Sequence, residues 1–594
     1  MGKITIWKLL KKNWPKAIII VVLIIITSFL STYPLNMLKE VIDTSVAAFE
    51  GRLDADAGIE KIITLAITYF ILQVLQSLFH NFSHYYNSTL QEKLAHDVRC
   101  EVYWHLSSVP QNFFDENDSS ELLNRLIQDS SIAIRGFMVP ITYLTRSIFS
   151  FAFGFYFMSQ IDIRLTLIIL PLAITSGIIT RLSGTKFWRF ARENRRRNSR
   201  MWRKYQENIK GMRDIHAASQ EETKYEQVIE TSYLVIDNHK KTQKYHVQVN
   251  FMNTFFFVLI ITTMLSFGGI MVVKGMVSIG GVSAILMYND LLAAPISNFV
   301  GMFLEMQNVS VSLGRLNTIM GYDIDKAYLA KKEKLDIDES DTVVKFENVT
   351  FSYVKDKVVI DDISFTVKKG ETHAFVGPTG CGKTTILKVL EGLYLVDEGK
   401  IEVFGYPMDE KYKLSLRQHI GYVFQDTFLF NATIRENIMF AAPKASEEQL
   451  NLAIKIACVD EIIAKNKEGL DTLVGENGVK LSGGERQRIG IARIILRNPS
   501  LILFDEATSA LDNNTELKVI NGIRNYLKDT TFIMIAHRLS TIEHSDCIYM
   551  LEEGKIVEQG THQELLELNG KYKKMYDAHK LQEMMGEKIN VEIS

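Results

Sequence analysis

The chain has 594 residues, too many for one hydrophobic core, so at least two domains are expected. Its 67 Lys and Arg and 69 Asp and Glu give a net charge of -2, which offers no argument for a nucleic-acid partner. The four cysteines (Cys100, Cys381, Cys458 and Cys547) form no C-x-x-C pair, so neither a disulfide framework nor a zinc site is expected.

Six apolar stretches in the first half are each long enough to cross a hydrocarbon core, which needs about 20 residues. They cover approximately residues 16–38, 59–82, 137–158, 163–182, 251–273 and 279–306. The first stretch has the length of a signal peptide, but it lacks a small-residue cleavage site and five more spans follow it. We therefore expect a retained helix and a six-helix membrane domain.

Basic residues predict the orientation of these spans. One cluster precedes the first span: Lys3, Lys8, Lys11, Lys12 and Lys16. A second lies between spans four and five: Lys186, Arg189, Arg192, Arg195, Arg196, Arg197, Arg200, Arg203 and Lys204. Both belong in the cytosol, and an even number of crossings returns the chain there. The basic, apolar segment 4–14 predicts either an interfacial helix on the inner leaflet or an ordinary basic flank.

The second half contains a phosphate-binding loop, GPTGCGKTT, directly after the apolar strand pattern THAFVG. Its glycines allow successive backbone N–H groups to close around phosphate oxygens. Lys383 adds a charge at the β- and γ-phosphates of a nucleotide, and the Thr384 hydroxyl can bind Mg²⁺. We expect the Cys381 thiol of this loop to be accessible to maleimide when no nucleotide is bound. The loop positions expected to bind nucleotide are Gly377, Pro378, Thr379, Gly380, Cys381, Gly382, Lys383, Thr384 and Thr385.

Two acidic residues, Asp505 and Glu506, end the apolar strand pattern LILFDEA. A buried strand is a costly place for a carboxylate that has no task. Asp505 suits Mg²⁺, and Glu506 is placed to polarise an attacking water as general base.

Further strings follow the phosphate loop in a fixed order: KLSGGERQR at residues 480–488, LILFDEA, SALD at 509–512 and IAHRLS at 535–540. Together they resemble the motifs of ATP-binding-cassette (ABC) transporters. The resemblance is strong over residues 343–568 and extends by topology over the first half. It implies a multidomain membrane protein, with a six-helix transmembrane domain of ABC exporter type followed by an α/β P-loop ATPase domain. The implied boundaries are 1–322 for the transmembrane domain with two long cytosolic loops, 323–342 for a linker, 343–580 for the nucleotide-binding domain and 581–594 for a tail.

The resemblance also implies roles for single residues. Ser482, Gly483 and Gly484 would bind ATP held by the opposite subunit. Tyr353 would stack on adenine, and Asp512 would link the two sites of a dimer. The implied catalytic set is Glu506, His537, Gln425 and Lys383, and the implied Mg²⁺ set is Thr384, Gln425 and Asp505.

Two segments of the first half, FFDENDSSELLNRLIQD at 113–129 and GMRDIHAASQEE at 211–222, resemble the intracellular loops of ABC exporters. In that family such loops carry short coupling helices that dock on the ATPase. The alternative is that they are only solvated amphipathic turns.

These features predict an ATP-driven half-transporter that dimerises and exports an amphipathic drug, lipid or peptide by alternating access. A homodimer is favoured because every catalytic position is intact, and the alternative partner is a different half-transporter. The alternative functions are an importer on an exporter fold and an ATP-gated channel or regulator. We expect a multi-pass protein of a bacterial plasma membrane, in contact with lipid and with its N-terminus and ATPase in the cytosol. Asp290, inside the sixth span, is predicted to line the translocation pathway, and the alternative is a packing pair with a basic residue such as Arg146.

Overall fold

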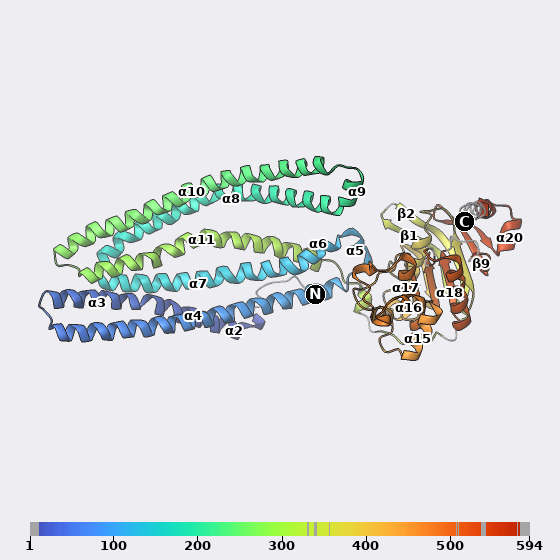
Figure 1. The fold of residues 1–594 in the computed structure, drawn as a ribbon, viewed down its shortest axis with the longest axis horizontal. Coiled ribbons are helices and arrows are strands. Elements are labelled where there is room, and N and C mark those ends of the chain that lie inside the picture. Colours follow the sequence, from blue (N-terminus) through green and yellow to red (C-terminus); the bar gives the residue numbers. More distant parts are fainter. Residues whose placement is uncertain are drawn as a thin grey trace. The chain divides into compact units, whose positions relative to one another are not determined.

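The computed structural model describes residues 11–329, 332–337, 341–355, 357–506, 508, 510–535, 542–578 and 580–581. The described residues form two compact units. The first, a membrane-type helical unit, holds residues 11–106 and 120–322, and the second, the ATPase unit, holds residues 107–119 and those from 323 onward. Every described strand belongs to the second unit (Figure 1). Residues 4–10 of the expected interfacial helix lie outside the described residues.

Long helices that run side by side build the first unit (Figure 1). They are α2 (Trp14–Thr32), α3 (Pro34–Phe49), α4 (Ala55–Leu106), α7 (Ser130–Ile161), α8 (Ile163–Lys210), α10 (Glu221–Val273) and α11 (Ile279–Met320). Short helices, α6 (Ser119–Asn124), the π-helix η1 (Arg125–Asp129) and α9 (Met212–Ala217), complete the two loops. Only Tyr33 separates α2 from α3, because Pro34 has no N–H to continue the hydrogen-bond ladder. Counted as one, α2 and α3 bring the long helices among the described residues to the expected six.

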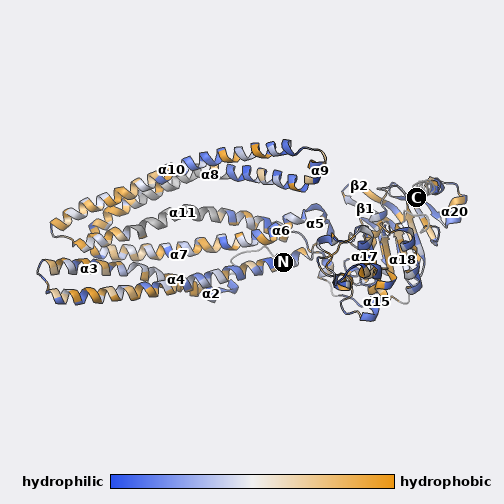
Figure 2. Cartoon of the chain, viewed as in Figure 1, coloured by the Kyte–Doolittle hydropathy of each residue, from blue (hydrophilic) through white to orange (hydrophobic). Residues whose placement is uncertain are grey.

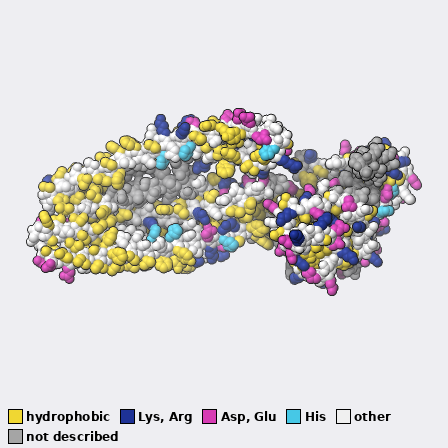
Figure 3. Space-filling model, viewed as in Figure 1, with side chains coloured by type: hydrophobic (Ala, Val, Ile, Leu, Met, Phe, Trp, Pro, Cys, Tyr) yellow, Lys and Arg dark blue, Asp and Glu magenta, His cyan; other side chains and the backbone are white. Residues whose placement is uncertain are grey.

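These helices are longer than a bilayer requires. The 52 residues of α4 span about 78 Å at a rise of about 1.5 Å per residue, against a hydrocarbon core of about 30 Å. Hydrophobic residues gather toward the helix ends that lie away from α9, and hydrophilic residues gather toward α9 (Figure 2). On the surface of this unit, hydrophobic side chains cover the ends away from α9, whereas charged side chains and a smaller hydrophobic patch occur near α9 (Figure 3). The helices therefore combine an apolar part with a polar extension beyond it.

Within the described residues, three helical segments are long and apolar enough to cross a membrane by length and composition: Trp14–Phe49, Ala55–Leu106 and Glu221–Val273. Two others carry shorter apolar runs among the described residues, Ile163–Leu172 and Ile279–Tyr288. None of the most apolar part of α4 is buried within the unit, as expected of a surface that faces lipid. A tight turn at Asp162 joins α7 to α8, and the Asp162 carboxylate caps α8 by accepting hydrogen bonds from the backbone N–H groups of Arg164 and Leu165.

The ATPase unit contains two sheets. An antiparallel sheet has the order β2-β1-β4-β5, and a six-stranded sheet has the order β10-β9-β3-β8-β7-β6. The strands are β1 (Thr342–Val354), β2 (Lys357–Lys368), β3 (Thr372–Val376), β4 (Glu398–Val403), β5 (Tyr406–Pro407), β6 (Ile420–Val423), β7 (Leu501–Asp505), β8 (Thr531–Ile535), β9 (Cys547–Glu552) and β10 (Lys555–Gly560). The longer helices are α12 (Lys383–Leu390), α15 (Glu447–Ile456), α17 (Gly483–Arg497) and α18 (Asn513–Tyr526). Short helical turns complete the unit: α5 (Gln111–Glu116), η2 (Lys326–Tyr328), α13 (Lys413–Leu416), α14 (Ile434–Met439), α16 (Asp460–Lys465), η3 (Gly469–Asp471), η4 (Glu476–Gly478) and α20 (His562–Glu567).

Parallel pairing in the larger sheet determines where the functional segments meet. β3 pairs with β8, β8 with β7, and β7 with β6, all in parallel. The carboxyl ends of these strands therefore lie along one edge, where Ile535 of β8 is paired with both Phe375 and Asp505. Ligands of open α/β sheets bind at such an edge. The phosphate loop, the acidic pair and the segment with Gln425 each follow one of these strands.

The loop at residues 107–119 packs into the ATPase unit. The Tyr394 hydroxyl donates a hydrogen bond to the carboxylate of Asp115 at the end of α5. The backbone N–H of Asp325 in the linker donates to the carbonyl oxygen of Ser108 at 2.8 Å. Both contacts are internal to this unit and fit a docking loop better than a solvated turn.

Candidate nucleotide-binding site

The phosphate loop takes a backbone conformation that requires glycine. Gly377, Gly380 and Gly382 have φ values of 145°, 84° and 106°. A Cβ on Gly377 would lie 2.2 Å from the carbonyl oxygen of Leu551, and one on Gly382 would lie 2.8 Å from that of Val359. The loop leads into the N-terminus of α12, so its backbone N–H groups and the positive end of the helix face the same space. This cradle fits the phosphates of a nucleotide.

Lys383 is buried at the start of α12, and its ammonium group lies over the loop. Nζ donates hydrogen bonds to the carbonyl oxygens of Gly377 at 2.8 Å and Pro378 at 2.9 Å. The Sγ atom of Cys381 lies 3.8 Å from the same Nζ. Cys381 is itself buried, in the apolar cluster beneath the loop. The expectation that its thiol is freely accessible is therefore wrong for this conformation, because the turn directs the side chain inward.

Asp505 and Thr384 bring together oxygens of the kind that Mg²⁺ prefers. Asp505 ends β7 and is only 4% exposed. Its Oδ1 accepts a hydrogen bond from the Thr384 hydroxyl at 3.0 Å, and its Oδ2 accepts one from the Tyr422 hydroxyl at 2.9 Å. Burial raises the pKa of the Asp505 carboxyl, while these two hydrogen bonds act in the opposite direction.

Glu506 follows with an unusual backbone, at φ 50°. A residue other than glycine is uncommon in this left-handed region, and such strain concentrates at functional sites. The Gln425 Nε2 donates to Glu506 Oε2 at 2.7 Å, so the glutamine from the segment after β6 meets the acid from the segment after β7. The sequence predicted both residues, and the structure brings them into contact.

A second glutamine, Gln487 of α17, was not predicted. Its Nε2 donates to the backbone carbonyl of Gln425 at 3.2 Å, and its Oε1 accepts from the backbone N–H of Ala510 at 3.1 Å. One buried amide thus ties the segment after β6 to the segment after β7. The available signal was a polar residue within the helix that follows LSGGE, and its buried position could not be read from the motif.

The signature residues pack on the segment that follows Glu506. Ser482 caps α17 in a capping box with Glu485. A Cβ on Gly484 would lie 2.7 Å from the carbonyl oxygen of Ala510, so the close approach requires glycine. Asp512 caps α18 by accepting from the Thr515 N–H at 3.0 Å, and hydrogen bonding to Thr515 lowers the pKa of the Asp512 carboxyl. The signature residues thus pack with the segment around Ala510, and Gln487 joins that segment to Gln425.

Tyr353 lies at the edge of the phosphate loop. Its hydroxyl donates to the Thr385 Oγ1 at 3.3 Å, and the residue is 41% exposed. An exposed aromatic residue beside the loop fits the expected contact with adenine. His537 and the side chain of Asp290 lie outside what the structure describes. Arg146, the alternative partner for Asp290, contacts a ring nitrogen of His80 at 2.7 Å.

Comparison with known proteins accounts for both units. Residues 17–296 match the ABC transporter transmembrane region, and residues 360–509 match the ABC transporter family. The putative multidrug export ATP-binding/permease protein YgaD of Bacillus subtilis is 30% identical, over 96% of this chain and 98% of that protein. The chain belongs to the ABC transporter family. The ATP-dependent lipid A-core flippase of Escherichia coli is 29% identical to this ABC transporter, over 97% of this chain and 98% of the flippase.

The fold of this ABC transporter also has a solved counterpart. The structure of a bacterial Atm1-family ABC exporter with ATP bound superimposes with a TM-score of 0.79 at 24% identity, covering 96% of this chain and 98% of that one. This likeness confirms the predicted fold class, a transmembrane helical domain followed by an α/β nucleotide-binding domain. Family membership also confirms that the chain binds ATP and couples its hydrolysis to transport.

Proposed function

We propose that this ABC transporter is one half of a homodimeric exporter that moves an amphipathic molecule out of the cytosol. The observation that carries the proposal is the meeting of Lys383, Thr384, Gln425, Asp505 and Glu506 at one edge of the β3-β8-β7-β6 sheet. Relatives named for multidrug export and for lipid A-core flipping support an exporter, and both cargoes are amphipathic.

Each ATP-site residue has a role in this proposal. Lys383 and the glycine loop hold the β- and γ-phosphates, and Tyr353 stacks on adenine. His537 contacts the γ-phosphate, and Gln425 positions the attacking water together with Glu506.

Hydrolysis depends on an oxygen-rich metal site and a base. Thr384, Asp505 and Gln425 would hold Mg²⁺, which would neutralise charge on the phosphates. The 3.0 Å contact between the Thr384 and Asp505 oxygens fits two such ligands. Glu506 accepts a proton from the attacking water, and its contact with Gln425 fixes the orientation of the carboxylate.

The proposed dimer follows from the different positions of the phosphate loop and the signature. Lys383 lies over the phosphate loop, whereas Ser482 and Gly484 pack with the segment after Glu506. We propose that the signature of one subunit completes the ATP site of the other. The chain has no degraded catalytic position, so two copies would make two equivalent sites and a homodimer suffices.

The second intracellular loop offers a contact for the partner subunit. A groove of about 580 Å³ lies beside α9, between the adjoining ends of α8 and α10, and Ile209, Met212 and Tyr225 are among its apolar lining residues. Apolar surface of this kind on a polar extension marks an interaction site. We propose that the ATPase unit of the partner docks on it.

Orientation follows from the basic clusters. The basic residues of α8, such as Arg195 and Arg200, are exposed on its polar extension. We propose a bacterial plasma membrane with the N-terminus, α9 and the ATPase unit on the cytosolic side.

The test is purification of this chain alone, followed by native mass measurement, ATPase assay and transport in inside-out vesicles. We expect a dimer, Mg²⁺-dependent hydrolysis, and ATP-dependent accumulation of Hoechst 33342 or of a fluorescent phospholipid. A monomer without turnover that becomes active only with a different half-transporter would contradict the homodimer. Uptake only in right-side-out vesicles would contradict export.

A further inference from the structure

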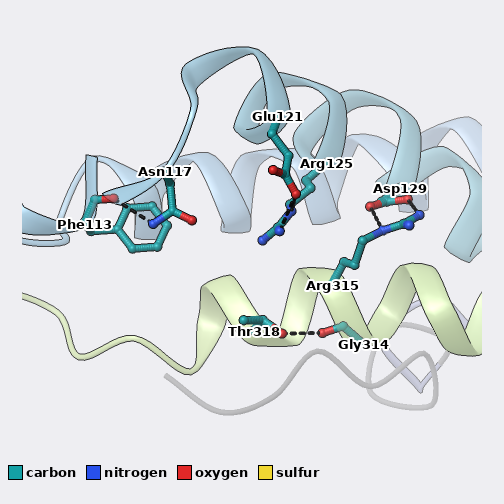
Figure 4. Close-up of polar contacts among 8 residues, drawn as sticks. All are labelled: Phe113, Asn117, Glu121, Arg125, Asp129, Gly314, Arg315 and Thr318. Carbon is teal, nitrogen blue, oxygen red and sulfur yellow. Dashed lines mark hydrogen bonds and ion pairs between the residues drawn. The ribbon is translucent and has the colours of Figure 1, made fainter. Parts of the chain in front are cut away.

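Asp129 is a buried carboxylate that the ATP site does not use. It ends the π-helix η1, and its side chain is 5% exposed. The Arg315 Nε donates to Asp129 Oδ2 at 2.7 Å and its Nη2 donates to Oδ1 at 2.5 Å, while the Ser312 hydroxyl donates to Oδ1 at 2.9 Å. Figure 4 shows Arg315 reaching from α11 to Asp129 across the gap between the helices. Two helices far apart in sequence are thus joined by a bidentate ion pair.

Such a pair is a poor device for stability alone. Taking a carboxylate out of water costs several kcal/mol, which the partner charge offsets only with good geometry. An apolar contact at the same place would hold the helices equally well. The pair does fix one orientation of α11 against η1, because the planar guanidinium must meet both carboxylate oxygens. η1 is also a π-helix, a rare and locally costly turn that recurs at functional positions.

Both joined segments lead along the chain into the ATPase unit within a few residues. α11 ends at Met320 and continues directly into the linker. On the other side, α6 precedes η1, and the chain before it is the loop 107–119, which belongs to the ATPase unit. A movement of that unit therefore reaches the helical unit along both segments.

The same two segments are tied a second time, inside the ATPase unit. Asp325 of the linker donates its backbone N–H to the carbonyl of Ser108, as described above. Its carboxylate pairs with Lys413 of α13 at 2.5 Å, and both side chains are buried. The linker that follows α11 is thus fixed by Asp325 to the loop that precedes α6, while α11 and η1 are themselves joined by Asp129.

We propose that Asp129 and Arg315 are positioning residues that clamp α11 to η1, so that a movement of the ATPase unit turns both helices together. Without the clamp, ATP is still hydrolysed but the outer ends of the helices respond less. This inference rests on the proposed homodimer.

The test uses spin labels on Phe49→Cys, in a full-length chain with Cys100→Ser and Cys547→Ser. Phe49 is exposed at the end of α3, far along the chain from the clamp. Pulsed electron paramagnetic resonance measures the distance between the two labels of the dimer, with and without ATP and vanadate. In the labelled chain without further mutations, hydrolysis and a nucleotide-dependent shift would support the proposed dimeric ATPase. Absence of both would contradict the proposed function and not the clamp.

Asp129→Asn should retain hydrolysis but lower the equilibrium constant for the shifted distance roughly 2- to 30-fold, the range of known coupling effects. Asp129→Asn/Arg315→Gln, which leaves no unpaired charge, should lose the response to the same extent, and it serves if the single variant does not fold. The matched control is Arg125→Gln, which removes the neighbouring Arg125–Glu121 ion pair at 2.5 Å and leaves Asp129 and Arg315 unchanged (Figure 4). The control should keep the full response. A full response in the double variant, or an equal fall of hydrolysis and response, would overturn the proposal.

Discussion

Replacing Glu506 by glutamine separates the effect on catalysis from the effect on folding. The substitution keeps the side-chain shape and the backbone, which is held at φ 50°. The new amide can present its oxygen to Gln425 Nε2, so the contact observed at 2.7 Å can persist. What disappears is the negative charge that accepts a proton from water.

The expected magnitudes differ widely. Hydrogen bonds to charged groups contribute about 1.5–3 kcal/mol and neutral ones about 0.5–1.5 kcal/mol, so the free energy of unfolding should fall by only about 1 kcal/mol. Loss of the general base should lower turnover about 10²- to 10⁴-fold, or roughly 3–5 kcal/mol in the activation barrier. ATP binding should be preserved, and the protein should accumulate with nucleotide bound.

Phosphate release measures turnover, a fluorescent ATP analogue measures binding, and thermal unfolding measures stability. The matched control is Glu553→Gln, because Glu553 also has a positive φ, 47°, but lies exposed in the turn between β9 and β10. The control should hydrolyse ATP normally. Turnover of Glu506→Gln close to that of the unmutated chain would remove Glu506 from its proposed role.

Three further predictions concern the same site. N-ethylmaleimide should label exposed Cys100 first, without loss of ATPase activity. Inhibition should follow later as buried Cys381 reacts, and bound ATP should slow that inhibition. Equal labelling rates of the two thiols would contradict the buried position of Cys381. Gly377→Ala should lower the free energy of unfolding by more than about 1 kcal/mol, because the new Cβ meets a carbonyl oxygen, whereas Gly370→Ala, at φ 81° with open space around it, should cost less in the same urea titration. Burial raises the pKa of the Asp505 carboxyl, so protons compete with Mg²⁺ at a higher pH than they would at an ordinary aspartate. The Mg²⁺ concentration for half-maximal ATPase activity should therefore rise as pH falls. A pH-independent concentration would contradict this.

The sequence predicted those parts of the site that depend on local chemistry. The phosphate loop can be predicted because glycine, lysine and hydroxyl residues must occur at fixed spacing. The structure shows the reason, since Gly377 and Gly382 have φ values above 80° and carbonyl oxygens lie where a Cβ would be. Asp505 and Glu506 could be predicted as functional residues because carboxylates rarely end an apolar strand unless they have a functional role. The parallel strand order then brought these segments to one edge.

Contacts between segments far apart in the chain could not be predicted from the sequence. Gln487, Tyr422 and the pair Asp129–Arg315 act through partners 23 to 186 positions away. Hydrophobic periodicity places a residue on a helix face but does not say which helix it meets. The positive φ of Glu506 was hidden for a similar reason, since only the surrounding packing can hold a non-glycine residue there.

The most direct test of the account is complementation between two inactive chains. Lys383→Ala removes the phosphate contact and Ser482→Arg blocks the signature, so each homodimer should be inactive. In a mixed dimer, one ATP site combines both defects and the other combines neither, provided that each site takes its loop and signature from different subunits. Random mixing should restore about a quarter of normal ATPase activity, because about half of the dimers carry one intact site of two. Two affinity tags isolate the mixed dimer, and a mixed dimer without ATPase activity would contradict the shared sites.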